Sequence, residues 1–327
     1  MESKVHLEFL DLAKGLGIFM VILGHGMFPN HFLIDSFHMP LFFILAGITF
    51  TPPSRLNTSN TKEWLFKKIE RIFVPYIFFA ILSGVIEVAV GRVNPSSLFN
   101  SPLWFLQTLF CSLLVYYTAS VFLSNRSINV LCFLIAVSTY YIYNYTAIAV
   151  VLPFALYRAL VAMVFIHLGT LLSNYYKKEQ CKTMVLMICT VAVLIFMSAL
   201  YISIKYYNVT GLNFHSGSIF TYSRYLPWIL AISGSVLVLY FSKLIKRIKP
   251  VNWMGVNSLV IMCVHFPLIE RLNVICASLP YYQFTMGKMA LAFTSYTITI
   301  AFSCLMVYVC KRVLPQFTGY SRTFLTK

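Results

Sequence analysis

Long apolar stretches recur along the whole chain, and short polar segments separate them. Several of these stretches exceed the ~18 apolar residues that a helix needs to cross a bilayer. They are continuous rather than alternating, which favours helices over the ~10-residue alternating strands of a membrane β-barrel. We therefore expect an all-α fold: a polytopic integral membrane helix bundle that forms one membrane-embedded domain over residues 1–327, with no separate soluble domain. About ten transmembrane helices are predicted, at 9–28, 34–51, 72–91, 102–123, 127–144, 150–173, 183–204, 225–242, 254–273 and 289–310.

The composition agrees with a membrane protein. Of the 327 residues, 59% are hydrophobic and 10% are charged, whereas soluble domains carry about 25% charged residues. Soluble globular classes can be set aside. The amino-terminal segment holds acidic residues as well as a lysine, and no small-residue cleavage site follows its apolar stretch. We therefore expect no cleavable signal peptide.

The net charge of +16 has a different interpretation in a membrane protein than in a soluble one. In a soluble chain such a surplus indicates a nucleic-acid partner. Here an even number of spans puts both termini on one side, and eighteen of the lysines and arginines lie on that side against five on the other. The positive-inside rule makes that side, and both termini, cytoplasmic. The surplus is then explained by topology and by contact with anionic membrane lipids, and no nucleic acid is expected.

The eight cysteines show no CxxC motif and no Cys/His ligand spacing. Cysteines inside apolar stretches usually serve as small apolar side chains. No metal site is expected.

The polar segment 52–71 contains a short amphipathic pattern. Trp64, Leu65, Ile69 and Ile72 can share one apolar face, with lysines opposite. This pattern indicates a short helix that lies in the membrane interface.

Three ionisable residues of the first span lie on one stripe. Lys14 and His25 are eleven residues apart, which places them within about 20° of the same direction, and Asp11 lies one turn before Lys14. Lys14 and His25 are about 16 Å apart along the axis, so they can contact two parts of one long ligand. The alternatives are a local Asp11–Lys14 ion pair that reaches the interface and a helix-packing hydrogen bond for His25.

The second span opens with Asp35 and His38, close in sequence to His25. A His–carboxylate pair there can tune or orient His25. The alternative is that Asp35 caps the helix.

Later spans hold further polar residues. Of these, Arg158 has the highest free-energy cost of burial in the membrane if it is unpaired, and Glu87 is a candidate partner. His167 is expected to have a structural role because it lies half a turn round the helix from Arg158.

Four segments carry a resemblance that covers nearly the whole chain. Taken together and in this order, they resemble the bacterial membrane acyltransferase-3 family, in particular its sugar O-acetylase branch, which includes fucose 4-O-acetylase-like proteins. This chain has Lys in place of the usual Arg at positions 14 and 68, and Ala46 in place of a usual serine. The segments are "FLDLAKGLGIFMVILGH", "SFHMPLFFILAG", "KKIERIFVPY", and "LWFLQTLF" together with "MGVNSLVIMCVHFPL".

The resemblance implies an enzyme of the bacterial cytoplasmic membrane. Its donor would be cytoplasmic acetyl-CoA, and its acceptor a hydroxyl of an extracytoplasmic or lipid-linked sugar of a cell-surface polysaccharide. Lys14, Lys68 and Arg71 would hold the donor phosphates through charge-assisted hydrogen bonds. The alternative for Lys68 and Arg71 is that they anchor the interfacial helix to lipid headgroups.

The resemblance also implies roles for the buried polar groups. His25 would be the general base, or would carry the acetyl group as an acyl-imidazole. The further catalytic candidates are Asp11, His38 and Asp35. The candidates for binding substrate or stabilising an oxyanion are Trp104, Asn257, Ser258, His265 and Arg158.

Two other functions fit a bundle with buried charges. One is a secondary transporter or flippase for a lipid-linked sugar or small solute, and the other is a structural or sensing membrane protein. The motifs favour the enzyme. Dependence on an acyl donor discriminates between transfer and transport.

Overall fold

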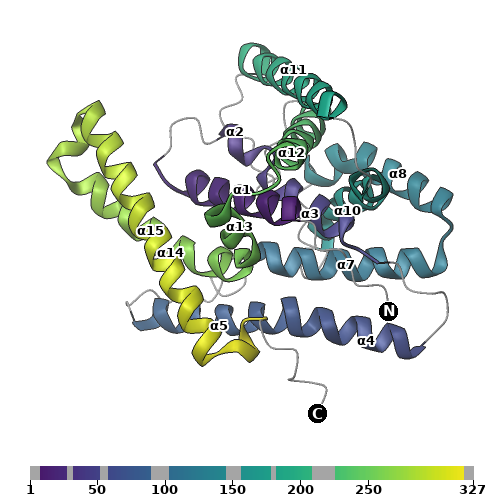
Figure 1. Ribbon diagram of the computed structural model, residues 1–327, viewed down its shortest axis with the longest axis horizontal. Coiled ribbons are helices and arrows are strands. Elements are labelled where there is room, and N and C mark those ends of the chain that lie inside the picture. Colours follow the sequence, from purple (N-terminus) through teal and green to yellow (C-terminus); the bar gives the residue numbers. More distant parts are fainter. Residues whose placement is uncertain are drawn as a thin grey trace.

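Helices make up every regular element among the residues that the structure describes (Figure 1). This computed structural model describes residues 8–27, 32–51, 58–89, 103–144, 156–177, 182–207 and 225–319. The all-α prediction is therefore confirmed for this part of the chain. The α-helices are α1 (Glu8–His25), α2 (Phe32–Asp35), α3 (His38–Ile48), α4 (Thr58–Lys68), α5 (Val74–Ala89), α7 (Trp104–Phe122), α8 (Asn125–Asn144), α10 (Leu156–Lys177), α11 (Lys182–Tyr207), α12 (Leu226–Ile245), α13 (Lys249–Val256), α14 (Ser258–Ser278) and α15 (Thr285–Val313). Three shorter elements are a π-helix, η1 (Ile69–Phe73), and the 3-10 turns η4 (Pro280–Gln283) and η5 (Pro315–Phe317).

Each predicted span contains a helix, and the chain forms a multi-pass membrane bundle. Five helical segments are long and apolar enough to cross a membrane by length and composition: Trp104–Phe122, Lys182–Lys205, Leu226–Ile245, Ser258–Ser278 and Thr285–Val313. The first helix, α1, has eighteen residues but carries Glu8, Asp11 and Lys14. Those charges lower its mean hydropathy and mark it as a helix that faces other parts of the protein.

Two predicted spans are broken where the sequence pattern indicated one continuous helix. The second, 34–51, is divided between α2 and α3, with turn residues at Ser36 and Phe37. Proline is tolerated in the first turn of a helix but not in its interior, so Pro40 fits a helix that restarts at His38. The N-cap residue of α3 is Phe37, whose side chain makes no capping hydrogen bond, and Asp35 is the last residue of α2. The ninth span, 254–273, is interrupted at Asn257, where α13 ends and α14 begins.

The segment predicted to form a short interfacial helix is helical, as α4, and the chain continues from it through η1 into α5. Figure 1 shows these elements in line along the lower edge of the molecule. Trp64 stacks on Tyr117 of α7, with ring centroids 4.1 Å apart. Pro75 has no N–H and its ring would press on the carbonyl of Arg71, four residues earlier. The chain widens into a π-turn at this point, in which the N–H of Val74 bonds to the carbonyl of Ile69.

Glycines allow two pairs of helices to cross backbone against backbone. Where α1 crosses α13, a Cβ on Gly15 would lie 1.9 Å from the carbonyl oxygen of Val251, and one on Gly255 would lie 1.8 Å from that of Asp11. Where α3 crosses α10, a Cβ on Gly47 would lie 2.0 Å from the carbonyl oxygen of Ile166. Small residues permit such close approach in membrane bundles, where van der Waals packing drives association.

Because the neighbour of Gly47 is backbone, it cannot move aside as a side chain can. We expect Gly47→Ala to force α3 and α10 apart and to cost about 1–3 kcal/mol. Thermal unfolding of the detergent-purified protein measures this as a lower Tm. The matched control is Gly17→Ala on α1, whose nearest neighbours are the side-chain ends of Phe42 and Leu41 at 3.0–3.3 Å. An unchanged Tm for Gly47→Ala would show that this crossing is not tight.

Candidate active site

A cavity of about 180 Å³ lies beside α1 near its amino-terminal half. Lys14 is the charged residue of its lining, and Thr49 and Ser258 supply hydroxyl groups. Five elements meet there, so side chains far apart in sequence face one small volume. The lining residues are Lys14 from α1; Phe42, Leu45, Ala46 and Thr49 at α3; Ile72 from η1; Phe105, Leu106 and Leu109 from α7; and Ser258, Leu259 and Met262 from α14.

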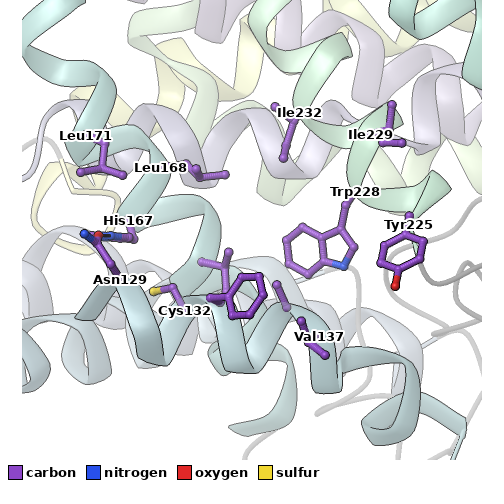
Figure 2. A pocket seen from close by; sticks show the side chains of 13 residues that line it. Asn129, Cys132, Val137, His167, Leu168, Leu171, Tyr225, Trp228, Ile229 and Ile232 are labelled. Atoms are coloured by element: carbon purple, nitrogen blue, oxygen red, sulfur yellow. Dashed lines mark hydrogen bonds between the residues drawn. The ribbon is translucent and has the colours of Figure 1, made fainter. Parts of the chain in front are cut away.

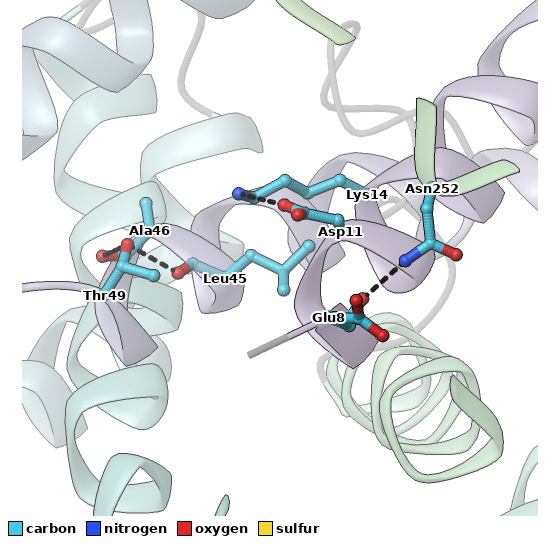
Figure 3. A network of polar contacts seen from close by, with 7 residues as sticks. All are labelled: Glu8, Asp11, Lys14, Leu45, Ala46, Thr49 and Asn252. Carbon is cyan, nitrogen blue, oxygen red and sulfur yellow. Dashed lines mark hydrogen bonds and ion pairs between the residues drawn. The ribbon is translucent and has the colours of Figure 1, made fainter. Parts of the chain in front are cut away.

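Lys14 also forms the local ion pair with Asp11 that the sequence analysis gave as an alternative. Its Nζ donates a hydrogen bond to Oδ1 of the buried Asp11 at 3.4 Å (Figure 3). The Lys14 side chain remains 33% exposed. Asp11 can therefore hold the ammonium group in place while that group still faces the cavity.

The other two predicted phosphate-binding residues lie beside this cavity rather than in its lining. Lys68 is half-buried, with its Nζ 5.8 Å from the centroid of the Trp64 ring. Arg71 is exposed and directly precedes Ile72, which does line the cavity. Both cations thus belong to the same helical segment that closes one side of the cavity.

Asn257 and Ser258 lie at the Lys14 end of the site. Ser258 is the first residue of α14 and lines the cavity. Asn257 is buried and its Nδ2 donates to the carbonyl of Trp253 at 2.7 Å. The interruption between α13 and α14 therefore brings the amino-terminal end of α14 to the cavity.

His25 lies at the opposite end of α1 and contacts α14. Its ring is exposed, and its centroid is 5.4 Å from that of His265 and 5.0 Å from that of Phe266, which it meets edge-on. His38 is buried at the start of α3, and its Nδ1 lies 3.9 Å from Oδ1 of Asp35, a carboxylate that packs against Gly24. We call His25, His38 and His265 the histidine cluster.

Hydrogen bonds fix the tautomers of two members of this cluster. Nδ1 of His38 lies 2.8 Å from the carbonyl oxygen of Ile34, and Nδ1 of His265 lies 3.0 Å from that of Ile261. A carbonyl oxygen only accepts, so Nδ1 carries the hydrogen in both rings. In the neutral ring Nε2 then has a free lone pair, which can accept a proton or a hydrogen bond.

Asp35 lies next to the histidine cluster, as its sequence position predicts. Its Oδ1 is 3.9 Å from Nδ1 of His38. The same oxygen lies 2.9 Å from the position that a Cβ on Gly24 would take, so the carboxylate packs against the residue before His25. Gly24 leaves the room for this contact.

The two helices of the site run in the same direction. Lys14 shares the cavity with Ser258, and His25 contacts His265. Residue numbers therefore increase in the same direction along α1 and α14, so the two helices are parallel. Ser258 and His265 are seven residues apart, within about 20° of one face of α14. Each helix therefore presents a polar group at the cavity and a histidine farther along the same face.

Arg158 and Trp104 form a separate contact. The Arg158 guanidinium carbon lies 5.7 Å from the centroid of the Trp104 ring, a cation–π geometry. Trp104 precedes the cavity-lining Phe105. The side chain of Glu87, the predicted partner of Arg158, lies outside the described residues.

His167 has the structural surroundings that its position predicts. Its Nδ1 lies 3.0 Å from the Tyr116 hydroxyl and its Nε2 lies 2.6 Å from Oδ1 of Asn129. Tyr116 also bonds to Thr170 at 2.8 Å. Both ring nitrogens are thus engaged in linking α10 to α7 and α8.

His167 also lines a larger cavity of about 620 Å³ between α8, α10 and α12 (Figure 2). Apolar side chains such as Phe133, Ile229 and Ile232 form most of its wall. None of the predicted site residues lines it. The smaller cavity at Lys14 is therefore the better candidate for chemistry.

Metal chemistry has no donor set in the part of the chain that the structure describes. No group of three or more His, Cys, Asp or Glu side chains there could hold a metal ion. The seven described cysteines are free thiols, buried or half-buried, in agreement with their prediction as apolar filler.

Two polar residues near His25 were not predicted. Asn273 of α14 donates from Nδ2 to the carbonyl of His25 at 2.9 Å, and the Tyr296 hydroxyl of α15 donates to the carbonyl of Leu23 at 3.4 Å. Neither residue belongs to a motif that the sequence marks. Only the packing of α14 and α15 against the end of α1 identifies them.

Comparison with known proteins gives one match. Residues 7–312 match the model of the acyltransferase-3 family, described as an acyltransferase domain. No curated protein and no solved structure matches the chain. The match spans nearly the whole chain, including every helix of the site described above.

Proposed function

The chain belongs to the acyltransferase-3 family and is a membrane-bound acyltransferase, and from that premise we propose that it is a sugar O-acetyltransferase of the bacterial cytoplasmic membrane. It takes an acetyl group from cytoplasmic acetyl-CoA. It transfers that group to a hydroxyl of an extracytoplasmic or lipid-linked sugar of a cell-surface polysaccharide. Membership of an acyltransferase family favours this reading over a transporter or flippase.

The observation that carries the proposal is the pairing of α1 with α14. Lys14 and Ser258 face one cavity, and about 16 Å farther along α1 the ring of His25 meets that of His265. Acetyl-CoA is a long molecule with phosphates at one end and a thioester at the other. Cations suit the phosphates, and histidines suit the reacting thioester, so a ligand extended along this face meets suitable chemistry at both ends.

The donor end contains Lys14, with Lys68 and Arg71 beside it on the helical segment that supplies Ile72. The cavity of about 180 Å³ suits the slender pantetheine arm, and the nucleotide remains at the cytoplasmic mouth. Asp11 lies fourteen residues from His25, about 21 Å along the helix, so in this proposal it positions Lys14 and takes no part in the chemistry. Asn257 and Ser258 lie at the same end of the site as Lys14, so in this proposal they contact the donor.

At the reaction end, a histidine takes the proton of the sugar hydroxyl as the oxygen attacks the thioester carbonyl. The new C–O ester bond forms, the C–S bond breaks, and the coenzyme A thiolate leaves and takes up a proton. His25 and His38 are the candidate bases, and Asp35 orients this end of the site. In the alternative route, the acetyl group passes through an acyl-imidazole on His25. Trp104 and Arg158 stay as candidates for substrate contact.

The proposed topology has ten transmembrane helices with both termini in the cytoplasm. It places Lys14 near the cytoplasmic face and His25 in the outer half of the membrane. The parallel direction of α1 and α14 supports it, since the first and ninth of ten spans both run outwards.

The kinetics of two variants test whether Lys14 binds the donor and His25 takes part in the reaction. Lys14→Met removes binding energy common to the ground and transition states, so the donor KM rises and kcat/KM falls about 10- to 150-fold. His25→Ala removes the base or nucleophile, so kcat falls by about 10²–10⁴ while coenzyme A still binds. Inverted membrane vesicles supplied with radiolabelled acetyl-CoA report transfer as base-labile label in membrane material, and equilibrium dialysis of purified protein reports coenzyme A binding.

The control for Lys14 is Arg247→Ala, which removes an exposed cation paired with Glu8 at 3.2 Å. We expect it to leave the donor KM unchanged. Near wild-type transfer by folded His25→Ala protein would contradict the reaction centre, and an unaltered donor KM in Lys14→Met would contradict the donor site.

Single exposed cysteines in a cysteine-free background test the topology. Ser124→Cys and Arg247→Cys should react with a membrane-impermeant maleimide only in inverted vesicles. Gln283→Cys, between α14 and α15, should react only in right-side-out vesicles. All three positions are exposed in the structure, so burial does not explain a missing reaction. The reverse pattern would refute both the orientation and the cytoplasmic donor.

A further inference from the structure

Side chains of α14 and α15 complete the carboxyl end of α1. The last carbonyl groups of a helix have no partner within it. Here the carbonyl of Leu23 accepts from the N–H of Gly26 at 3.2 Å and from the Tyr296 hydroxyl at 3.4 Å. The carbonyl of His25 accepts from Nδ2 of Asn273 at 2.9 Å. The backbone next to His25 is therefore held by two neighbouring helices.

This arrangement leaves two acceptor atoms of α14 unused. Within the described residues, Nε2 of His265 and Oδ1 of Asn273 are buried and have no hydrogen-bond partner. The His265 side chain is almost fully enclosed, at 1% exposure. A buried polar atom without a partner costs stability, and natural structures keep few of them. Two such atoms on one helix, both beside His25, indicate a site that is completed by a ligand.

The chemistry of the two atoms restricts that ligand. In His265, the hydrogen on Nδ1 is donated to the carbonyl of Ile261, so Nε2 of the neutral ring carries a lone pair and no hydrogen. In Asn273, the NH₂ group donates to the carbonyl of His25, so the open atom is the carbonyl oxygen Oδ1. With His265 neutral, both open atoms therefore accept hydrogen bonds. An ionised carboxylate or a thioester carbonyl brings only acceptors and leaves both atoms unsatisfied. A hydroxyl group satisfies either atom.

The spacing of the two atoms restricts the ligand further. His265 and Asn273 are eight residues apart, about 12 Å along α14. Side chains of one helix tilt in the same direction, so this offset also separates the two acceptor atoms. Two hydroxyls of one sugar ring are closer together than this. His25, which contacts both residues, is exposed.

We infer that α14 provides the acceptor subsite: His265 and Asn273 accept hydrogen bonds from hydroxyl groups on a carbohydrate of more than one sugar unit. One hydroxyl lies beside the ring of His25, at His265, and the other lies beside the carbonyl of His25, at Asn273. This inference rests on the proposed acetyl transfer and adds the residues that hold its acceptor. It also assigns His265 to substrate binding, because the open nitrogen of the neutral ring carries no hydrogen to donate to an oxyanion.

Three variants test the subsite in the vesicle assay with radiolabelled acetyl-CoA and the acceptor native to the membrane. Asn273→Ala removes an acceptor atom and one bond to the end of α1. Tyr296→Phe is the matched control, since it also removes a bond to the end of α1 but none of the open acceptors. His265→Phe keeps an aromatic ring of similar size without Nε2. Coenzyme A binding to each purified variant serves as the donor-side measurement.

We expect Asn273→Ala and His265→Phe each to lower transfer about 5- to 150-fold, the range for leaving a buried hydrogen bond unmade. Coenzyme A affinity should stay within about twofold of wild type, and Tyr296→Phe should keep near wild-type transfer. Retained transfer in Asn273→Ala, or equal losses in Asn273→Ala and Tyr296→Phe, would overturn the subsite. A folded His265→Phe that transfers normally would overturn it as well.

Failure of the proposed function has a different signature. Wild-type vesicles would then show no transfer from acetyl-CoA that depends on this protein. That result would refute the proposed function and, with it, the acceptor subsite. Loss of transfer in Asn273→Ala together with loss of coenzyme A binding would overturn the subsite alone, because the residue would then act on the donor side.

Discussion

The close crossing of α1 and α13 sets the geometry on which the site depends. Gly15 and Gly255 let the two backbones touch, so α1 can neither rotate nor slide without breaking this contact. In the orientation that results, Lys14 faces the cavity and His25 meets His265. Asn252 of α13 adds a hydrogen bond to the carbonyl of Glu8 at 2.8 Å, which fixes the start of α1 as Asn273 fixes its end (Figure 3).

A fixed α1 gives the protein two chemically different ends. Its eighteen residues extend about 27 Å, close to the ~30 Å hydrocarbon thickness of a bilayer. The cation at one end is held by Asp11, and the histidine at the other is surrounded by side chains with open acceptor atoms. A donor and an acceptor that approach from opposite sides of a membrane can therefore meet on one helix face. In the proposed function, this arrangement accounts for acidic and basic groups that are costly in lipid.

The sequence predicts the features that depend on helical periodicity. The Asp11–Lys14 pair, the nearness of Asp35 to the end of α1 and the helix before residue 69 all follow from residue spacing, and the structure contains each of them. Features that depend on contact between helices could not be predicted. The interruption at Asn257 and the capping of α1 by Asn273 are set by α13, α14 and α15 packing on α1, and no local pattern marks them. The π-turn had a local signal in Pro75, but its register depends on the helices around it.

A structure with coenzyme A bound tests the central claim most directly, namely that one face of α1 spans the donor from its phosphates to its thiol. We expect density for the pantetheine arm in the cavity between α1, α3, α7 and α14, with the phosphates beside Lys14 and the thiol directed toward His25. Coenzyme A bound instead in the apolar cavity between α8, α10 and α12, or with its thiol at Lys14 and its phosphates at His25, would contradict it.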